Sequence, residues 1–306
     1  MKWWSQIRFG FFVSTFLFGL GMSTHAQAND KENQVKAFPE RHGQVSQQLF
    51  LGEGKKQALI VGLGGSEGGN PWASNFWKAQ RDRFIEQGYA VLALGYFGTK
   101  ESPAKLDRIA LEGIHSAVMK AAQTSGVNQE CIIVMGGSRG GELALLLASR
   151  YAEYDAAIAI VAGSSVFPAL TMTMDTPGWS HQGQLLPFVP VSEATYPALM
   201  RRDLRAAFST MMEDKAAMAA AAIPVEKING PVMLLSAKQD EMWPSTEMSE
   251  MVVQRLKEKS FGFPVQHIAI DGSHTAPLKH FNLVEQFLNT ELTRSKPECA
   301  TSLSTP

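Results

Sequence analysis

Short apolar runs alternate with helix-forming segments along most of the chain, and this alternation constrains the fold more than any other feature. The apolar runs, which we expect to be strands, cover residues 57–63, 89–97, 131–137, 155–163, 231–240 and 265–274. The segments expected to be helical cover residues 72–87, 103–123, 140–151, 201–222, 244–256 and 281–292. Continuous apolar strands separated by helices predict an α/β fold with a mostly parallel central sheet and helices on both faces.

The segment of residues 163–222 interrupts this alternation. Its first part is rich in prolines and large aromatic residues: Pro168, Pro177, Pro187, Pro190, Pro197, Phe167, Trp179, Phe188 and Tyr196. An insert of this length is usually functional or disordered. We expect it to form a cap or pocket wall over the C-terminal edge of the sheet. Residues 29–56 are expected to add an initial strand or hairpin, so that residues 29–306 form a single domain.

The first 28 residues are typical of a signal peptide. Lys2 and Arg8 precede the uncharged apolar stretch of residues 9–22, and Ala26-Gln27-Ala28 fits a cleavage site. The alternative is an uncleaved anchor, but the apolar stretch is shorter than the roughly 20 residues of a membrane span. We therefore expect cleavage after Ala28 and a periplasmic or secreted protein without stable membrane insertion. The formal net charge of −1 gives no reason to expect a nucleic-acid partner.

A G-x-S-x-G motif lies between an expected strand and an expected helix. Its central serine is Ser138, flanked by Gly136 and Gly140. A strand before this motif and a helix after it are typical of a nucleophilic serine on a strained turn, where glycines relieve crowding. The alternative is an ordinary helix N-cap serine. We favour the nucleophile, because both flanking elements are expected.

A nucleophilic serine needs a base, and the base needs an acid that orients it. His274 follows the last expected strand in a glycine-rich loop, and Asp240 ends the strand before it. This gives the chain order serine, acid, histidine. Glu241 and Asp271 are rival acids; Asp240 is favoured because it is closer to the end of its strand. The other histidines lie in less suitable places: His25, His42, His115, His181, His267 and His280.

An oxyanion needs two backbone N–H donors. We expect one from Arg139, which follows the serine, and one from Gly65 or Ser66 in the loop "GLGGSEGG". The glycine spacing of this loop does not match the patterns that bind nucleotide phosphates. No spacing of ligand residues predicts a metal site, and no cofactor is expected.

The chain has two cysteines, Cys131 and Cys299. An oxidising compartment permits a disulfide between them. The last helix is expected to return toward the edge where the strands begin, so the geometry does not exclude this bond. We nevertheless favour Cys131 as a plain buried residue.

Several stretches together resemble a known family. They are "GGSRGGELALLLAS", "AVLALGYFG", "PGWSHQGQLLPFVPV", "IPVEKINGPVMLLSAKQDEMWPS" and "GSHTAP". They resemble the C-terminal catalytic domain shared by acyl-CoA thioester hydrolases and bile acid-CoA:amino acid N-acyltransferase, over roughly residues 57–280. The resemblance implies an α/β-hydrolase fold related to dienelactone hydrolase. It also implies Ser138 as nucleophile, Asp240 as acid in a D-x-x-W loop and His274 as base.

Three departures from that family affect the predicted function. Its aminoacyl transferases carry cysteine where this chain has Ser138, its animal enzymes carry an N-terminal β-sandwich domain that residues 29–56 cannot supply, and acyl-CoA is a cytosolic metabolite. We therefore expect an exported serine hydrolase of a small-molecule acyl ester or thioester, acting through an acyl-enzyme. Acyl transfer to an amine or alcohol, peptidase activity and a non-catalytic binding protein are the alternatives. Pocket residues are expected among Phe167, Trp179, Phe188 and Trp243. The sequence leaves the oligomeric state open.

Overall fold

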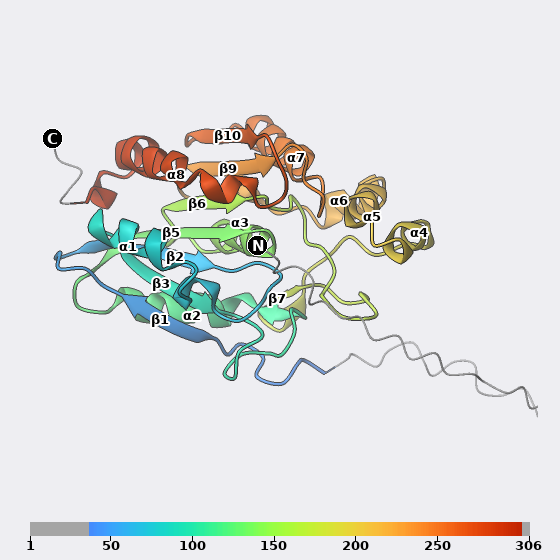
Figure 1. The fold of residues 1–306 in the computed structure, drawn as a ribbon, viewed down its shortest axis with the longest axis horizontal. Helices are drawn as coiled ribbons and strands as arrows, with labels where there is room; N and C mark the ends of the chain where they lie inside the picture. Colours follow the sequence, from blue (N-terminus) through green and yellow to red (C-terminus); the bar gives the residue numbers. More distant parts are fainter. Residues whose placement is uncertain (1–36, 302–306) are drawn as a thin grey trace, which may run out of the picture. The chain divides into compact units, whose positions relative to one another are not determined.

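The computed structural model describes residues 37–301 and is built around a seven-stranded sheet. The strand order is β1-β3-β2-β5-β6-β9-β10 (Figure 1). β1 runs antiparallel to β3, and the other neighbours are parallel. The strands are β1 (Ser46–Phe50), β2 (Gln57–Leu63), β3 (Ala90–Gly95), β5 (Val127–Gly137), β6 (Ala156–Ile160), β9 (Val232–Ala237) and β10 (Val265–Ile270). The predicted signal peptide lies outside the described residues.

Helices cover both faces of this sheet, as the sequence predicts. They are α1 (Lys78–Glu86), α2 (Leu111–Ala122), α3 (Arg139–Arg150), α7 (Ser245–Glu258), α8 (Phe281–Phe287) and α9 (Thr293–Ser295). Successive side chains of a strand point to opposite faces. In β2, Leu59 and Val61 pack in one core layer with α2, α3 and α7, whereas Ala58 and Ile60 pack in another with α1 and α8. This arrangement confirms the α/β fold class.

The insert follows β6, the strand after α3, where the sequence places it. It contains β7 (Trp179–His181), β8 (Gln184–Leu185), α4 (Tyr196–Met200), α5 (Leu204–Met211) and α6 (Lys215–Ala220). β7 pairs with β8 and with the short β4 (Ile109–Ala110) in a second sheet. Ser165 and Ala222 form a β-bridge, so the two ends of the insert meet. Figure 1 shows α4, α5 and α6 to the right of the central sheet.

Three expected helices are shorter than the sequence suggests. The helix expected from residue 72 begins at Lys78, after a separate turn (η1, Pro71–Ala73). The helix expected from residue 103 begins at Leu111, because Ile109 is extended and its N–H donates to Gly178 O at 2.8 Å. Residues 201–222 form two helices, because Asp203 and Asp214 each accept a backbone N–H and start a new helix.

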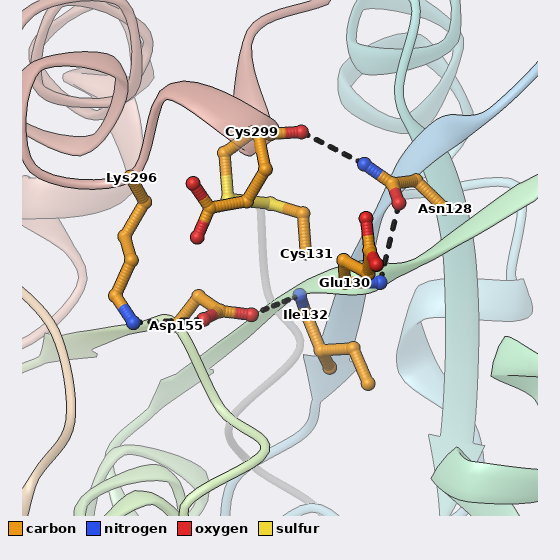
Figure 2. The surroundings of a disulfide bond; sticks show 8 residues. Asn128, Glu130, Cys131, Ile132, Asp155, Lys296 and Cys299 are labelled. Atoms are coloured by element: carbon orange, nitrogen blue, oxygen red, sulfur yellow. Dashed lines mark hydrogen bonds and ion pairs between the residues drawn. A yellow bond between two sulfur atoms is a disulfide. The ribbon is translucent and has the colours of Figure 1, made fainter.

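The interpretation of Cys131 as a plain buried residue is wrong. Cys131 and Cys299 form a disulfide, with 5.1 Å between the Cα atoms (Figure 2). The C-terminal segment returns to the start of β5 and is also held there by polar contacts. Asn128 Nδ2 donates to Glu298 O at 2.8 Å, and Lys296 Nζ lies 3.2 Å from Asp155 Oδ1.

One further observation concerns membranes. Among residues 37–301, we find no helix with the length and apolar character needed to cross a bilayer.

Candidate active site

Ser138 lies on a strained turn between β5 and α3. Its φ of 56° and ψ of −121° are unusual for a residue with a side chain. Its backbone N–H donates to Ile160 O at 2.8 Å, which ties the turn to the end of β6. The side chain makes no capping hydrogen bond to α3 and is half-exposed. The N-cap alternative therefore does not describe what this side chain does.

Two glycines make the close strand–helix approach at this turn possible. A Cβ atom at Gly136 would lie 2.2 Å from Gly140 O, and one at Gly140 would lie 2.2 Å from Gly64 O. Both distances are far below van der Waals contact. The crowding that the sequence pattern predicts is therefore present, and it joins the turn to the glycine-rich loop after β2.

Asp240 and His274 form a buried acid–imidazole pair. Asp240 follows β9 and His274 follows β10, two neighbouring parallel strands whose C-terminal ends share one edge of the sheet. His274 Nδ1 lies 2.8 Å from Asp240 Oδ1 and 2.9 Å from Oδ2. Asp240 Oδ1 also accepts the Met242 N–H at 2.9 Å, which fixes the carboxylate. The arrangement leaves Nε2 as the imidazole nitrogen free to act as a base.

The two rival acids make different contacts. Glu241 Oε2 accepts the backbone N–H of His274 at 2.9 Å, so it positions the histidine loop rather than the ring. Asp271 is exposed and lies 3.1 Å from Lys238 Nζ. Of the three candidate acids, Asp240 is the one that bonds to the imidazole.

Ser138 and His274 are connected through the segment after β6. Ser138 N–H bonds to Ile160 O, while the Trp243 indole donates to Val161 O at 2.9 Å. The Trp243 ring lies 6.4 Å from the His274 ring. Within residues 37–301 no hydrogen bond joins Ser138 Oγ to His274. Such bonds are often long in free enzymes and shorten when substrate binds.

The three residues predicted to supply oxyanion donors differ in their burial and in their contacts near Ser138. Gly65 is buried and adjacent, because a Cβ atom placed on it would lie 3.1 Å from Ser138 Cβ. Ser66 is exposed. The Arg139 N–H has no acceptor among residues 37–301, as is usual for the first residue of a helix. Of the two loop candidates, Gly65 is the one with a described contact distance to Ser138, and the role of either as an oxyanion donor stays a prediction.

Two residues of this region were missing from the sequence prediction. Glu67 Oε1 accepts the Gly65 N–H at 3.0 Å, and the Tyr96 hydroxyl donates to Gly64 O at 2.5 Å. Burial raises the pKa of Tyr96 well above its ordinary value, so its hydroxyl stays protonated and can donate. Glu67 could have been noticed as the single acidic residue of "GGSEGG", whereas Tyr96 directly follows the apolar strand β3 and gives no such signal.

The aromatic residues expected to form a pocket are mostly buried in packing contacts. Phe167 and Trp243 lie 5.8 Å apart and both contact Phe208, which the sequence prediction missed. Trp179 packs 5.7 Å from Tyr96 in the main core. Phe188 is half-buried against that core. Of these four, the aromatic ring with a described contact to the acid–imidazole pair is that of Trp243.

A buried ion pair attaches the insert to the helix that follows Ser138. Arg139 NH1 lies 2.8 Å from Glu142 Oε2, and both side chains are almost fully buried. Glu142 Oε1 accepts from the Trp179 indole at 2.6 Å, and Arg139 NH2 donates to Phe167 O at 3.2 Å. The signal for this pair was two opposite charges three positions apart in an otherwise apolar helix.

A metal centre has little support in the described part of the chain. One group of possible ligands lies close enough together there: Cys131, Asp155 and Cys299. The two sulfurs form the disulfide, so they cannot act as thiolate ligands.

Comparison with known families gives a match over more than half of the chain. The family described as "BAAT / Acyl-CoA thioester hydrolase C terminal" matches residues 110–275. This range begins just before α2 and includes Ser138, Asp240 and His274.

Curated proteins and solved structures also show similarity. Acyl-coenzyme A thioesterase 6 of Mus musculus is 26% identical over 73% of this chain and 50% of its own length. Acyl-coenzyme A amino acid N-acyltransferase 1 of the same species is 25% identical over the same shares. This chain therefore spans about half the length of the curated relatives it matches. The α/β hydrolase GrgF from Penicillium sp. sh18 superposes with a TM-score of 0.50 and 15% identity, over 84% of this chain and 99% of its own.

Proposed function

The chain belongs to the BAAT / acyl-CoA thioester hydrolase C-terminal family, and from this we propose that it is an exported serine hydrolase that cleaves an acyl ester or thioester. The observation that carries the proposal is the buried Asp240–His274 pair at the sheet edge where Ser138 occupies a strained, half-exposed turn. Strain is stored at functional sites when the surrounding structure supports it.

In the proposed reaction, His274 Nε2 takes the proton of the Ser138 hydroxyl while Oγ attacks the carbonyl carbon of the substrate. Asp240 holds the imidazole by its Nδ1–H and stabilises the imidazolium. The imidazolium then returns the proton to the leaving alcohol or thiol, which leaves an acyl group on Ser138. Water, deprotonated by His274, attacks the acyl-enzyme; the imidazolium then gives the proton to Ser138 Oγ as the bond to the acyl group breaks and the acid leaves.

The negative charge of each tetrahedral intermediate is proposed to rest on two backbone donors. These are the N–H groups of Arg139, the residue after Ser138, and of Gly65 in the loop after β2. Donors that are fixed before the reaction stabilise developing charge without reorganisation. The acyl group is proposed to extend toward Trp243 and Phe208, because the Trp243 ring packs against both the His274 ring and the Phe208 ring.

Export is proposed from the signal-like first 28 residues and is supported by the disulfide. Disulfides persist in oxidising compartments and are rare in the cytosol. An exported enzyme does not meet cytosolic acyl-CoA, so we propose other acyl esters or thioesters as substrates.

A fluorophosphonate probe and a panel of p-nitrophenyl esters, acyl thioesters and aminoacyl anilides test this proposal. We expect the wild-type protein to take the label and to hydrolyse esters or thioesters, and Ser138→Ala to lose both properties. Ser74→Ala, a change at an exposed serine whose side chain makes no hydrogen bond within residues 37–301, is the control and should retain both.

Each alternative has its own result in the same panel. Faster product formation with an added amine or alcohol, together with acylated acceptor, would indicate acyl transfer. Preference for anilides would indicate a peptidase. A folded wild-type protein that takes no label would contradict the proposal and favour a non-catalytic binding protein.

A further inference from the structure

The N–H group of Gly65 already has a ligand from the chain itself. We propose that the Glu67 carboxylate is an internal ligand of this oxyanion donor, which the carbonyl oxygen of the substrate must displace before the reaction. The inference rests on the function proposed above. It assigns Glu67 a gating role at the site, without a role in bond making or breaking.

The carboxylate lies on the side of Gly65 that faces the nucleophile. Glu67 Oε1 accepts the Gly65 N–H at 3.0 Å. A Cβ atom built on Gly65 would lie 2.9 Å from Glu67 Oε2 and 3.1 Å from Ser138 Cβ. The second carboxylate oxygen and the serine side chain therefore approach the same point. A substrate carbonyl that bonds to Gly65 N–H must use the space that Glu67 now fills.

The peptide that carries this N–H is held from the opposite side. In a trans peptide the C=O and N–H groups point in opposite directions. The Tyr96 hydroxyl donates to Gly64 O, the carbonyl of the Gly64–Gly65 peptide, at 2.5 Å. The buried tyrosine therefore fixes the direction of the Gly65 N–H. When the substrate replaces Glu67, the carboxylate moves and the Gly64–Gly65 peptide does not rotate.

The Glu67 side chain can leave at low cost. Glu67 is exposed, so its carboxylate regains water when it rotates away. The loop backbone around it stays anchored, because Gly69 N–H donates to Phe97 O at 2.9 Å. The hydrogen bond is partly buried and has one exposed partner, so its net free energy is modest and a bound carbonyl can replace it.

A carboxylate that remained in place would oppose the reaction. The intermediate carries a negative charge on the oxygen bound to Gly65, and two like charges at short range repel each other. Removal of the Glu67 charge should therefore favour both substrate binding and the anionic intermediate.

The test compares Glu67→Ala and Glu67→Gln with the wild type. The substrate is p-nitrophenyl acetate, and the second probe is phenylboronic acid, whose adduct with Ser138 carries a negative charge like the intermediate. We expect kcat/KM to rise about three- to tenfold in Glu67→Ala and the inhibition constant for phenylboronic acid to fall by a similar factor. Glu67→Gln keeps a hydrogen-bond acceptor without the charge, so its kcat/KM and inhibition constant should lie between those of the wild type and Glu67→Ala. Glu101→Ala, a change at an exposed acid in the loop after β3, is the matched control and should match the wild type.

The possible results separate this inference from the proposed function. Glu67 variants that match Glu101→Ala within twofold, or that are slower than the wild type at an unchanged melting temperature, overturn the gating role alone. A wild-type protein that neither cleaves the ester nor takes a fluorophosphonate label overturns the proposed function, and the gating role with it.

Discussion

Two acidic residues that are adjacent in sequence make different contacts with the same histidine. Asp240 bonds to the His274 ring, whereas Glu241 accepts the His274 backbone N–H. Asp240 is also fully buried and accepts further N–H groups from its own loop. The roles proposed for the two carboxylates therefore differ because they contact different atoms of His274.

We predict that Asp240→Asn lowers kcat by about 10⁴-fold with little change in fold. The asparagine amide can occupy the same space, but its NH₂ group favours the wrong imidazole tautomer. Ester hydrolysis by the purified variant measures the loss, and circular dichroism checks the fold.

The matched variant is Glu241→Gln, which keeps an oxygen acceptor for the His274 N–H. Its kcat should stay within about tenfold of the wild type, because the ring contact is intact. If Glu241→Gln lowered kcat more than Asp240→Asn, the roles that we assign to the two carboxylates would have to be reversed.

The candidate triad could be predicted from the sequence because each member follows a strand. Ser138, Asp240 and His274 stand where β5, β9 and β10 end, and parallel strands present these ends at one edge. Glu67 and Tyr96 could not be assigned in this way, because their roles depend on side-chain directions in three dimensions. The hydroxyl of Tyr96 reaches a carbonyl 32 positions earlier in the chain.

At the scale of elements, the close contact between β5 and α3 is possible because glycines, which have no side chain, lie where the two elements meet. We predict that Gly136→Ala lowers the free energy of unfolding by about 3 kcal/mol or prevents folding. The added Cβ would lie 2.2 Å from Gly140 O, so the strand and the helix must separate. Urea unfolding followed by circular dichroism measures the change.

Gly137→Ala is the control for this prediction. Nothing lies within 4 Å of a Cβ atom at Gly137, and its φ is not positive. The free energy of unfolding of this variant should lie within about 1 kcal/mol of the wild-type value. Equal stability of the two alanine variants would show that the turn relaxes without cost.

A salt bridge between two elements gives a prediction for pH. Arg255 of α7 donates two hydrogen bonds to Glu226 of η3 (Val225–Lys227), at 2.6 and 2.8 Å. These bonds lower the pKa of Glu226 below its ordinary value of 4.5. A lowered pKa in the folded state means stabilisation above pH 4.5 that is lost as the pH falls through the lowered pKa.

We predict that Glu226→Gln lowers the melting temperature by roughly 1–3 °C at pH 7. The difference from the wild type should shrink below the ordinary pKa of glutamate and disappear at lower pH. Glu213→Gln, at an exposed acid without a side-chain partner within residues 37–301, should show no difference at any pH. A difference that persists after Glu226 is protonated would assign the effect to packing.

The elements themselves were predicted unevenly. Each central strand contains an apolar run, so its position follows from the sequence pattern, although β5 begins at Val127 with polar residues that the expected strand from residue 131 did not include. The helix expected from residue 103 was too long, because the backbone at Ile109 pairs with a strand of the insert. No local pattern near Ile109 reports a partner some 70 positions later. Local sequence therefore predicts the elements that have a clear apolar pattern. It misses the elements whose bounds depend on pairing with a segment far away in the sequence.

At the scale of the whole chain, one covalent bond joins the middle of the sheet to the C-terminal segment. Cys131 and Cys299 are separated by 168 positions, and both are fully buried (Figure 2). The sequence predicted that the last helix returns toward the edge where the strands begin, but it does not fix the short distance between two cysteines that a disulfide needs, so a plain buried cysteine was favoured. Cross-links that close long loops restrict the unfolded chain strongly.

We predict that the double variant Cys131→Ala/Cys299→Ala loses about 2–5 kcal/mol of unfolding free energy, with a melting temperature lower by roughly 5–15 °C. Alanine is chosen because it introduces no polar group into the buried site. Differential scanning calorimetry of both proteins in non-reducing buffer measures the difference.

Reduction provides the control within the same pair of proteins. A strong reductant, applied during unfolding and refolding, should lower the melting temperature of the wild type to that of the double variant. The double variant should not respond, because it has no disulfide to lose. Both sulfurs are buried, so reduction should proceed only through unfolding and accelerate with temperature or denaturant. A wild-type protein whose cysteines react with a thiol reagent in denaturant without prior reduction would show that the bond is not formed. In that case the export proposal would lose its structural support.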